Sequence, residues 1–416
     1  MAKIFHAHLH GDRDTKYDRL MKSNIGNTKW SEISPQTPFY LLIPQDVNLL
    51  VEYEKTWRIT DVMLNNVLGF QTHRDHFAVD FSHQELEERI LEFRNPQLSD
   101  KEIQDKYNVC DNRDWNVKAA RKSLQQDQNW QESLITCLYR SFDWRYCYFS
   151  TAAMDYPRQE LIKHVAKKEN LCLGVGRQGM AVNEPEWALV SVSSDPMDAN
   201  IFRRGGINVF PLYLYPETEE KALGITRRPN LSQPFLNDIT AKLGYTPTPE
   251  AIFHYIYAIF HSPTYRSRYA EFLKIDFPRV PLTRNDTLFR QLAAYGEQLV
   301  ALHLMKSAKL TQTHQHPHFV EQGGNCIVDP AHPKYEINTR SVVINKRGDR
   351  FTDIPQAVWD FYVGGYPVCA KWLKDRKGRT LSPADIDHYQ QIIVALSETI
   401  KLMTAIDQAI PGFPIE

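Results

Sequence analysis

A run of cationic side chains near the C-terminus is the part of the sequence best suited to binding a charged ligand. Its members are Lys371, Lys374, Arg376, Lys377 and Arg379, with Trp372 among them and Asp375 as the single acid. Such side chains bind phosphate groups. Trp359, Phe361, Tyr362 and Tyr366, which precede the run, are expected to be buried and to anchor it. A second interpretation stays open, because several cations and a following Gly378 are also typical of the C-terminal end of a solvated helix.

Arginine and glutamine side chains also lie beside short β-like segments in the middle of the sequence. They are Arg140, Arg145, Arg177, Gln178, Arg203 and Arg204. Arg can bond guanine O6 and N7 in a bidentate manner, and Gln can bond adenine N6 and N7, each giving about 1–3 kcal/mol of discrimination. These residues are therefore candidates for reading base edges in duplex DNA. The alternative for the arginines is an ion pair with a local acid such as Asp143.

Motifs spread over most of the chain indicate one protein family. In chain order they occupy residues 139–145 (Tyr-Arg-Ser-Phe-Asp-Trp-Arg), 174–178, 202–206, 253–263, 265–266, 277–281, 359–366, 371–379 and 381–400. Together they resemble the C-terminal specificity region of type ISP restriction-modification enzymes. Ser141 stands where the family usually has proline, which is expected to loosen a turn without removing any chemistry.

The resemblance implies a division of tasks within a larger enzyme. Such enzymes are long single chains that join a nuclease, a helicase-like ATPase, an adenine methyltransferase and a target-recognition domain. By this resemblance the chain would be the target-recognition part, which holds double-stranded DNA for a methyltransferase domain or subunit. Methyl transfer from S-adenosylmethionine to adenine N6, after base flipping, would belong to that partner.

The motifs that catalyse these reactions are missing from the sequence. No Asn-Pro-Pro-Tyr-type loop occurs, since Asn95-Pro96-Gln97 departs from it at two positions, and no glycine-rich cofactor loop is present. A Gly-x-x-x-x-Gly-Lys-Ser/Thr phosphate loop, a nuclease-like Asp with Glu-x-Lys, and a Gly-x-Ser-x-Gly elbow are also missing. We therefore expect no catalytic residue, metal ion or cofactor in this chain.

Alternating histidines suggest a competing function. His6, His8 and His10 would share one face of a strand, an arrangement that metal-dependent hydrolases use. His314, His316 and His318 alternate as well, but Pro317 and polar neighbours favour a surface loop. A metal-dependent hydrolase that uses the first group is the main alternative, and a scaffold whose basic patches bind acidic protein is a third hypothesis.

The composition is that of an ordinary water-soluble globular protein. The 416 residues are 42% hydrophobic with a mean hydropathy of -0.46, enough for two or three domains. With 49 basic and 50 acidic residues the net charge is -1, so a DNA contact requires a local basic face, and the isolated chain should bind DNA weakly.

The sequence shows neither a membrane-spanning run nor a signal-peptide core, which predicts the cytoplasm. Six scattered cysteines predict reduced, structural thiols.

The sequence predicts an α+β fold that combines a β-rich recognition subdomain of short irregular strands with a helical subdomain. Strands are expected near residues 39–43, 134–139, 144–149, 171–175, 187–192 and 208–215, and a hairpin at 335–345 with a basic turn at 346–349. Helices are expected to begin at residue 59 and to cover residues 252–260 and 288–302. Two more are expected near the C-terminus: an aromatic helix that runs to Lys374, and one that follows the N-cap Ser382 with Pro383 at its first position. The last helix should pack on those at 252–260 and 288–302.

Four segments follow from these patterns. Residues 1–81 would follow a missing methyltransferase domain, and residues 82–133 would form a charged spacer of exposed helices. Residues 134–248 would be the β-rich target-recognition subdomain. Residues 249–416 would be a mostly helical C-terminal subdomain with a hairpin near 335–350.

Overall fold

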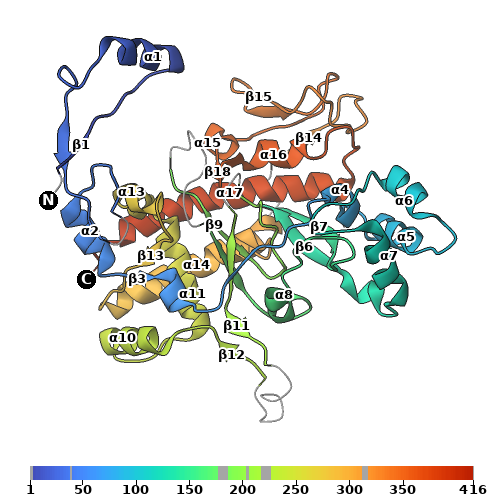
Figure 1. The fold of residues 1–416 in the computed structure, drawn as a ribbon, viewed down its shortest axis with the longest axis horizontal. Coiled ribbons are helices and arrows are strands. Elements are labelled where there is room, and N and C mark those ends of the chain that lie inside the picture. Colours follow the sequence, from blue (N-terminus) through green and yellow to red (C-terminus); the bar gives the residue numbers. More distant parts are fainter. Residues whose placement is uncertain are drawn as a thin grey trace. The chain divides into compact units, whose positions relative to one another are not determined.

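The chain forms two compact units, Met1–Glu54 and Lys55–Glu416. Figure 1 shows the computed structural model, which describes residues 3–37, 40–176, 186–202, 206–216, 226–311 and 317–415. Its helices and short antiparallel strands make the α+β fold that the sequence predicts. Among the described residues, no helix is both long and apolar enough to span a membrane.

The N-terminal unit has little apolar interior. Strand β1 (Ile4–His6) pairs antiparallel with β2 (Ser31–Ile33), helix α1 (Arg13–Lys22) buries none of its side chains, and helix α2 (Val47–Glu54) follows. The expected strand at 39–43 is wrong over residues 40–43, because Tyr40 has a left-handed backbone with φ +46° that a strand cannot accommodate. Phe39 lies outside the described residues.

A four-stranded antiparallel sheet lies within the second unit. Its order is β4 (Val67–Leu68), β10 (Asn208–Pro211), β8 (Cys172–Val175) and β9 (Val190–Ser193). Strands β8 and β9 are buried along their whole length, which explains their β-branched and apolar composition. A pair formed by β11 (Tyr213–Leu214) and β12 (Arg228–Pro229) follows, so the strands expected at 171–175, 187–192 and 208–215 are confirmed.

A three-stranded sheet supports the charged helices. Its order is β5 (Val79–Asp80), β7 (Asp143–Tyr148) and β6 (Leu134–Arg140), preceded by helix η1 (Trp130–Ser133). The helices are α5 (His83–Phe93), α6 (Asp100–Tyr107) and α7 (Val117–Gln126). The sequence predicted a spacer of exposed helices here. The structure shows instead that Leu86, Phe93 and Leu124 share one apolar core with Tyr148 of β7.

Three long helices form the core of the C-terminal half, and Figure 1 shows α17 running beside α14. They are α11 (Pro249–His261), α14 (Asp286–His303) and α17 (Pro383–Ala409). Gly296 allows α14 to approach α11 closely, since a Cβ there would lie 1.8 Å from the His254 carbonyl oxygen. Ser382 and Asp385 form a capping box before α17, as the sequence predicts. The predicted packing of this helix on the other two is confirmed.

The remaining elements are short. The helices are α3 (Ile59–Val62), α4 (Asp75–Ala78), α8 (Gln159–Val165), α10 (Gln233–Leu243), α12 (Pro263–Arg268), α13 (Ala270–Leu273), η2 (Ala308–Thr311), α15 (Gln356–Trp359) and α16 (Val368–Lys374). A sheet in the order β14 (Phe319–Val320), β17 (Arg350–Phe351), β16 (Ser341–Val343) and β15 (Lys334–Glu336) contains the expected hairpin, with the turn at 346–349 between β16 and β17. β18 (Tyr362–Val363) and β19 (Tyr366–Pro367) form one further hairpin.

Strand pairs join segments that are far apart in the sequence. β3 (Trp57–Arg58) pairs with β13 (Arg279–Val280), β4 pairs with β10, and β5 pairs with β7. Each pair crosses at least one of the segment boundaries expected at residues 81, 133 and 248. Those boundaries stay predictions. The three strand pairs connect described residues of the second unit on either side of them.

Two histidines near the α11–α14 contact, buried His261 and partly buried His303, make stability depend on pH. Burial, and the nearby Arg266 guanidinium, lower the pKa of His303 to about 3, and burial lowers the pKa of His261 well below its ordinary value. A neutral His303 ring bonds the Tyr257 hydroxyl through Nδ1 (2.6 Å) and the Thr399 hydroxyl through Nε2 (2.9 Å). Both rings are therefore uncharged in the folded chain at neutral pH.

We expect the free energy of unfolding to fall when the pH is lowered from 7 to 5. In this pH range only the unfolded chain binds a proton at His303, so protonation favours unfolding. The contribution of His303 to the free energy of unfolding is complete above pH 6.5 and falls by about 2 kcal/mol on reaching pH 5. Urea unfolding at several pH values measures the change. His303→Gln should flatten the profile, and an identical profile in the variant would contradict this explanation.

Candidate nucleic-acid interface

Two segments that contain predicted base-reading residues adjoin the same end of the four-stranded sheet. Val175 at the end of β8 lies opposite Asn208 at the start of β10 and opposite Val190 at the start of β9. The segment after β8 and the segment before β10 therefore start from neighbouring strand ends. Arg177, Gln178, Arg203 and Arg204 belong to these segments and lie outside the described residues.

The β18–β19 hairpin packs against residues that flank both loops. Gly364 N donates a hydrogen bond to the Ala188 carbonyl oxygen (3.0 Å), shortly after the first loop. A Cβ on Gly364 would lie 2.2 Å from Cδ1 of Phe202, the last described residue before the second loop. The hairpin therefore contacts a described residue beside each of the two segments.

This hairpin replaces part of the aromatic helix that the sequence predicted up to Lys374. The expectation is wrong there because Gly364 and Gly365 adopt left-handed backbone angles (φ +55° and +81°), which make a tight turn instead of a helix. The aromatic residues are also less buried than expected. Trp359, Phe361 and Tyr366 are only partly buried, and Tyr362 is 48% exposed.

A buried carboxylate binds two of the arginines that the sequence predicted to contact DNA. Asp143, 1% exposed, accepts hydrogen bonds from Arg145 (2.7 Å) and Arg376 (2.9 Å). Burial by itself would raise the pKa of Asp143, but the two guanidinium groups hold it below its ordinary value. Both guanidinium groups also stack on the Phe81 ring, at 4.1 and 4.8 Å from its centroid. We call Phe81, Asp143, Arg145 and Arg376 the arginine cluster.

Arg140 is held in a similar way. Its guanidinium pairs with Asp198 (3.1 Å) and lies 3.9 Å from the centroid of the Tyr139 ring. Burial raises the pKa of Asp198 to about 6, and Arg140 opposes that rise. Arg140, Arg145 and Arg376 thus each have an acidic partner, but only the Arg145–Asp143 pair is the local ion pair that the alternative interpretation named. The assignment of all three arginines to DNA stays a prediction.

The other cations of the basic run are more accessible. Lys371 pairs with Asp375, Lys377 Nζ bonds the Pro330 carbonyl oxygen (2.6 Å), and exposed Arg379 stacks on Phe81 at 4.3 Å. Lys374 is exposed and has no ion-pair partner in the described part of the chain. Lys374, Lys377 and Arg379 are thus the members of the run that present charge to solvent.

A metal site finds no support in the described residues. Only His6 of the N-terminal histidines lies in a strand, and no group of three or more His, Cys, Asp or Glu side chains there could hold a metal ion. Of the second histidine group, His314 and His316 lie outside the described residues. The hydrolase alternative is therefore not favoured.

Three solved structures of DNA complexes share this fold. They are a nuclease-deletion mutant of the Type ISP restriction-modification enzyme LlaGI with a DNA substrate mimic (19% identity, TM-score 0.66), the ATP-dependent Type ISP enzyme LlaBIII bound to DNA (18%, 0.71) and a DrdV–DNA complex (18%, 0.73). Each match covers 97% of this chain but only 38%, 27% and 43% of the respective neighbour. The chain thus spans less than half the length of each, and at these identities the likeness concerns the fold alone.

The sequence itself defines the family. Residues 61–405 match the Type ISP C-terminal specificity domain, and the chain belongs to this family. No curated protein matches the chain. The family resemblance predicted from the sequence motifs is thus confirmed.

Proposed function

We propose that this chain selects a sequence in double-stranded DNA for a methyltransferase domain or subunit. Its family of specificity domains and three neighbours in complex with DNA or a DNA mimic support the proposal. The geometric observation that supports it best is the shared origin of two Arg- and Gln-containing loops at one sheet end, beside one hairpin. Separate loops on one rigid support can present several side chains to one groove.

The candidate residues divide into three roles under this proposal. Arg177, Gln178, Arg203 and Arg204 would read base edges, whereas Lys374, Lys377 and Arg379 would contact phosphates. Arg140, Arg145, Lys371 and Arg376, also predicted to bind DNA, would add positive charge near the duplex from positions fixed by the ion pairs described above. Phosphate contacts fix the position on the duplex, and base contacts provide the sequence preference.

Catalysis would belong to the partner. Asn95 and Pro96 lie in the turn between α5 and α6, where the Asn95 carbonyl oxygen accepts a hydrogen bond from Arg121 (2.7 Å), a structural contact rather than a catalytic loop. S-adenosylmethionine would be bound by the methyltransferase part. The system would act on DNA in the cytoplasm.

Arg177→Ala and Gln178→Ala should relax the sequence preference. Removing a bidentate base contact should weaken binding to the selected sequence by about 1–3 kcal/mol, or roughly 5- to 150-fold, with little effect on unrelated duplexes. Selection from a random duplex library gives the preferred sequence, and fluorescence anisotropy then measures affinities. Equal losses on both duplexes would contradict the base-reading role.

Lys377→Ala should weaken binding to all duplexes alike. Loss of one phosphate contact lowers the steepness of the plot of log affinity against log salt concentration by about 0.9. Titrations at several salt concentrations measure this slope. A loss confined to the selected sequence would show that Lys377 does more than contact the backbone.

A further inference from the structure

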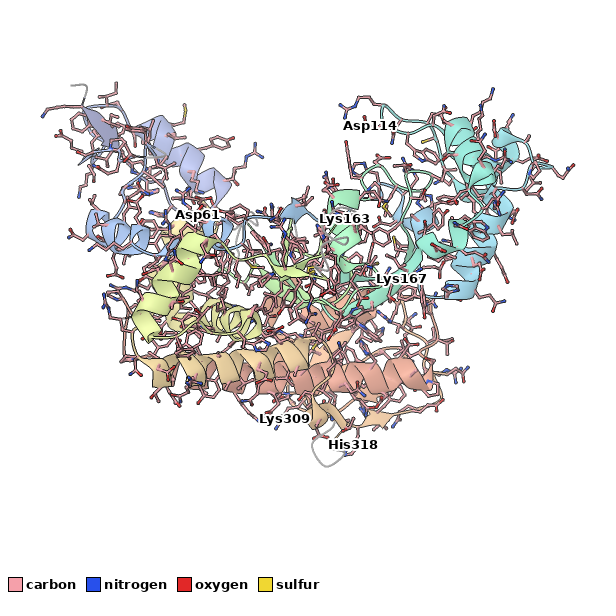
Figure 2. All side chains as sticks on the ribbon, turned by 90° about the horizontal axis from the view of Figure 1, so that it is seen from below. Asp61, Asp114, Lys163, Lys167, Lys309 and His318 are labelled. Atoms are coloured by element: carbon pink, nitrogen blue, oxygen red, sulfur yellow. The ribbon has the colours of Figure 1, made fainter. Side chains whose placement is uncertain are left out.

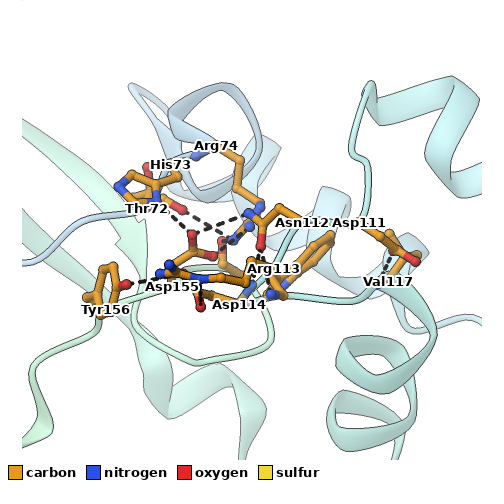
Figure 3. A network of polar contacts seen from close by, with 12 residues as sticks. Thr72, His73, Arg74, Asp111, Asn112, Arg113, Asp114, Val117, Asp155 and Tyr156 are labelled. Atoms are coloured by element: carbon orange, nitrogen blue, oxygen red, sulfur yellow. Dashed lines mark hydrogen bonds and ion pairs between the residues drawn. The ribbon is translucent and has the colours of Figure 1, made fainter.

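A cluster of charged and aromatic side chains lies where three loops of the Lys55–Glu416 unit meet. Figure 3 shows residues 72–74, 111–114 and 155–156 joined by polar contacts. Gln71 and Tyr156 exchange two backbone hydrogen bonds of 3.0 Å, which fix the first loop to the third. The Tyr156 hydroxyl donates to Asp114 (3.2 Å), which fixes the second loop to the third. The side chains on these loops therefore have defined positions.

His73 is oriented by a buried carboxylate at this site. Its Nδ1 lies 2.6 Å from Oδ2 of Asp155, whose side chain is 1% exposed and also binds Arg74 (2.6 Å). The imidazole is about half exposed (49%), and its Nε2 has no hydrogen-bond partner in the described part of the chain. The ring thus offers one nitrogen to solvent in a fixed direction, and in its protonated form that nitrogen donates a hydrogen bond.

Arg158 is a cation without an acidic partner. Its guanidinium lies 4.9 Å from the centroid of the Tyr156 ring, the same ring that His73 meets edge-on at 5.7 Å. Its buried Nε has no hydrogen-bond partner, and no ion pair of Arg158 exists among the described residues. Neighbouring Arg113 differs, since two of its nitrogens bond Asp114, both at 2.8 Å.

Both residues also adopt backbone angles that disfavour their side chains. His73 has φ +56° and Arg158 has φ +57°, in the left-handed region that glycine tolerates best. Such strain persists where the surrounding contacts impose it, and it is concentrated at functional sites. A fixed imidazole and an unpaired guanidinium on one aromatic ring are suited to binding an anion such as a phosphate.

The site is within reach of the duplex that the loops are proposed to read. Leu68 of β4 pairs with Asn208, at the sheet end from which those loops start. His73 is five residues further on, so the two lie at most about 18 Å apart, or about half a turn of B-form DNA. Figure 2 shows Lys163 and Lys167, in α8 and its following turn, on the same side of this unit as Asp114 and opposite Lys309 and His318.

We propose that Arg158 and His73, both in contact with the Tyr156 ring, bind backbone phosphates of the recognised duplex. The site rests on the proposed function and extends it, because it adds an anchor outside the base-reading loops and outside the basic run at 371–379. Backbone anchors of this kind set the position from which base contacts are made.

Arg158→Gly tests the site without removing an ion pair. Glycine relieves the left-handed backbone, so the melting temperature should stay the same or rise, whereas affinity should fall several-fold on selected and unrelated duplexes alike. The salt slope, measured by anisotropy with fluorescein-labelled duplexes between about 50 and 200 mM salt, should fall by about 0.9. His73→Asn, which also tolerates this backbone, should lower the affinity for both duplexes.

Arg340→Gly is the matched control. Arg340 is an exposed arginine with φ +50° in the turn between β15 and β16, and Figure 1 shows β15 well away from α8. Its replacement should leave affinity and slope unchanged. If Arg158→Gly and His73→Asn bound DNA as tightly as the wild type and with the same salt slope, the site would be overturned and the proposed function would stand. An equal loss of affinity in Arg340→Gly would have the same consequence. A wild-type chain that binds neither duplex at low salt would overturn both.

Discussion

Asp143→Asn is expected to destabilise the second unit by about 3–5 kcal/mol, because it removes the nearest counter-charge of two largely buried guanidinium groups. Their remaining acids are more distant, Asp375 at 3.5 Å from Arg145 and Asp385 at 3.7 Å from Arg376. The Arg145 and Arg376 side chains are only 12% and 6% exposed, so water cannot replace the lost carboxylate. The substitution preserves the size of the side chain, which limits the effect to charge and hydrogen bonding. Urea unfolding followed by circular dichroism measures the loss of stability.

Asp286→Asn provides the comparison. Asp286 also pairs with an arginine, Arg290 (2.8 Å), but both side chains are largely exposed (44% and 62%). Exposed ion pairs contribute about 0–1 kcal/mol, so this variant should remain close to wild type. Similar losses in the two variants would show that burial of the arginine cluster does not determine its contribution.

The arginine cluster also marks the limit of the sequence-based prediction. Arg145 is two residues from Asp143, so a local pair between them was among the expected alternatives. Arg376 lies 233 residues away, and nothing in the sequence links it to Asp143. Phe81, on which Arg145, Arg376 and Arg379 all stack, was not singled out, because a single aromatic residue gives no signal of the cations around it.

Elements with a regular apolar period were predictable from the sequence. Helices α11, α14 and α17 show apolar residues at helical spacing, and α17 also has its N-cap Ser382 and first-turn Pro383. The aromatic segment before Lys374 was harder to predict because it suggests a buried helix, although its adjacent glycines are a turn signal. Local sequence patterns therefore predict the helices and strands. The long-range strand pairing, which brings the two base-reading segments to one sheet end, is visible only in the structure.

Gly364→Ala is expected to abolish most sequence-specific DNA binding. A side chain at φ +55° costs about 1–2 kcal/mol. The added Cβ would also lie 2.2–2.5 Å from three atoms of Phe202, an overlap that typically costs about 1–3 kcal/mol. Either the hairpin or Phe202 must move, and under the proposed function both help to position the neighbouring base-reading residues. We therefore expect at least a tenfold loss of affinity for the selected duplex, measured by anisotropy.

Gly378→Ala separates backbone strain from this displacement. Gly378 lies in the same C-terminal stretch and also has a left-handed backbone (φ +78°), but a Cβ there would meet no atom within 4 Å. Both variants should therefore lose stability through strain, whereas only Gly364→Ala should lose preference for the selected duplex over an unrelated one. If both variants kept that preference, the hairpin would not position the base-reading residues.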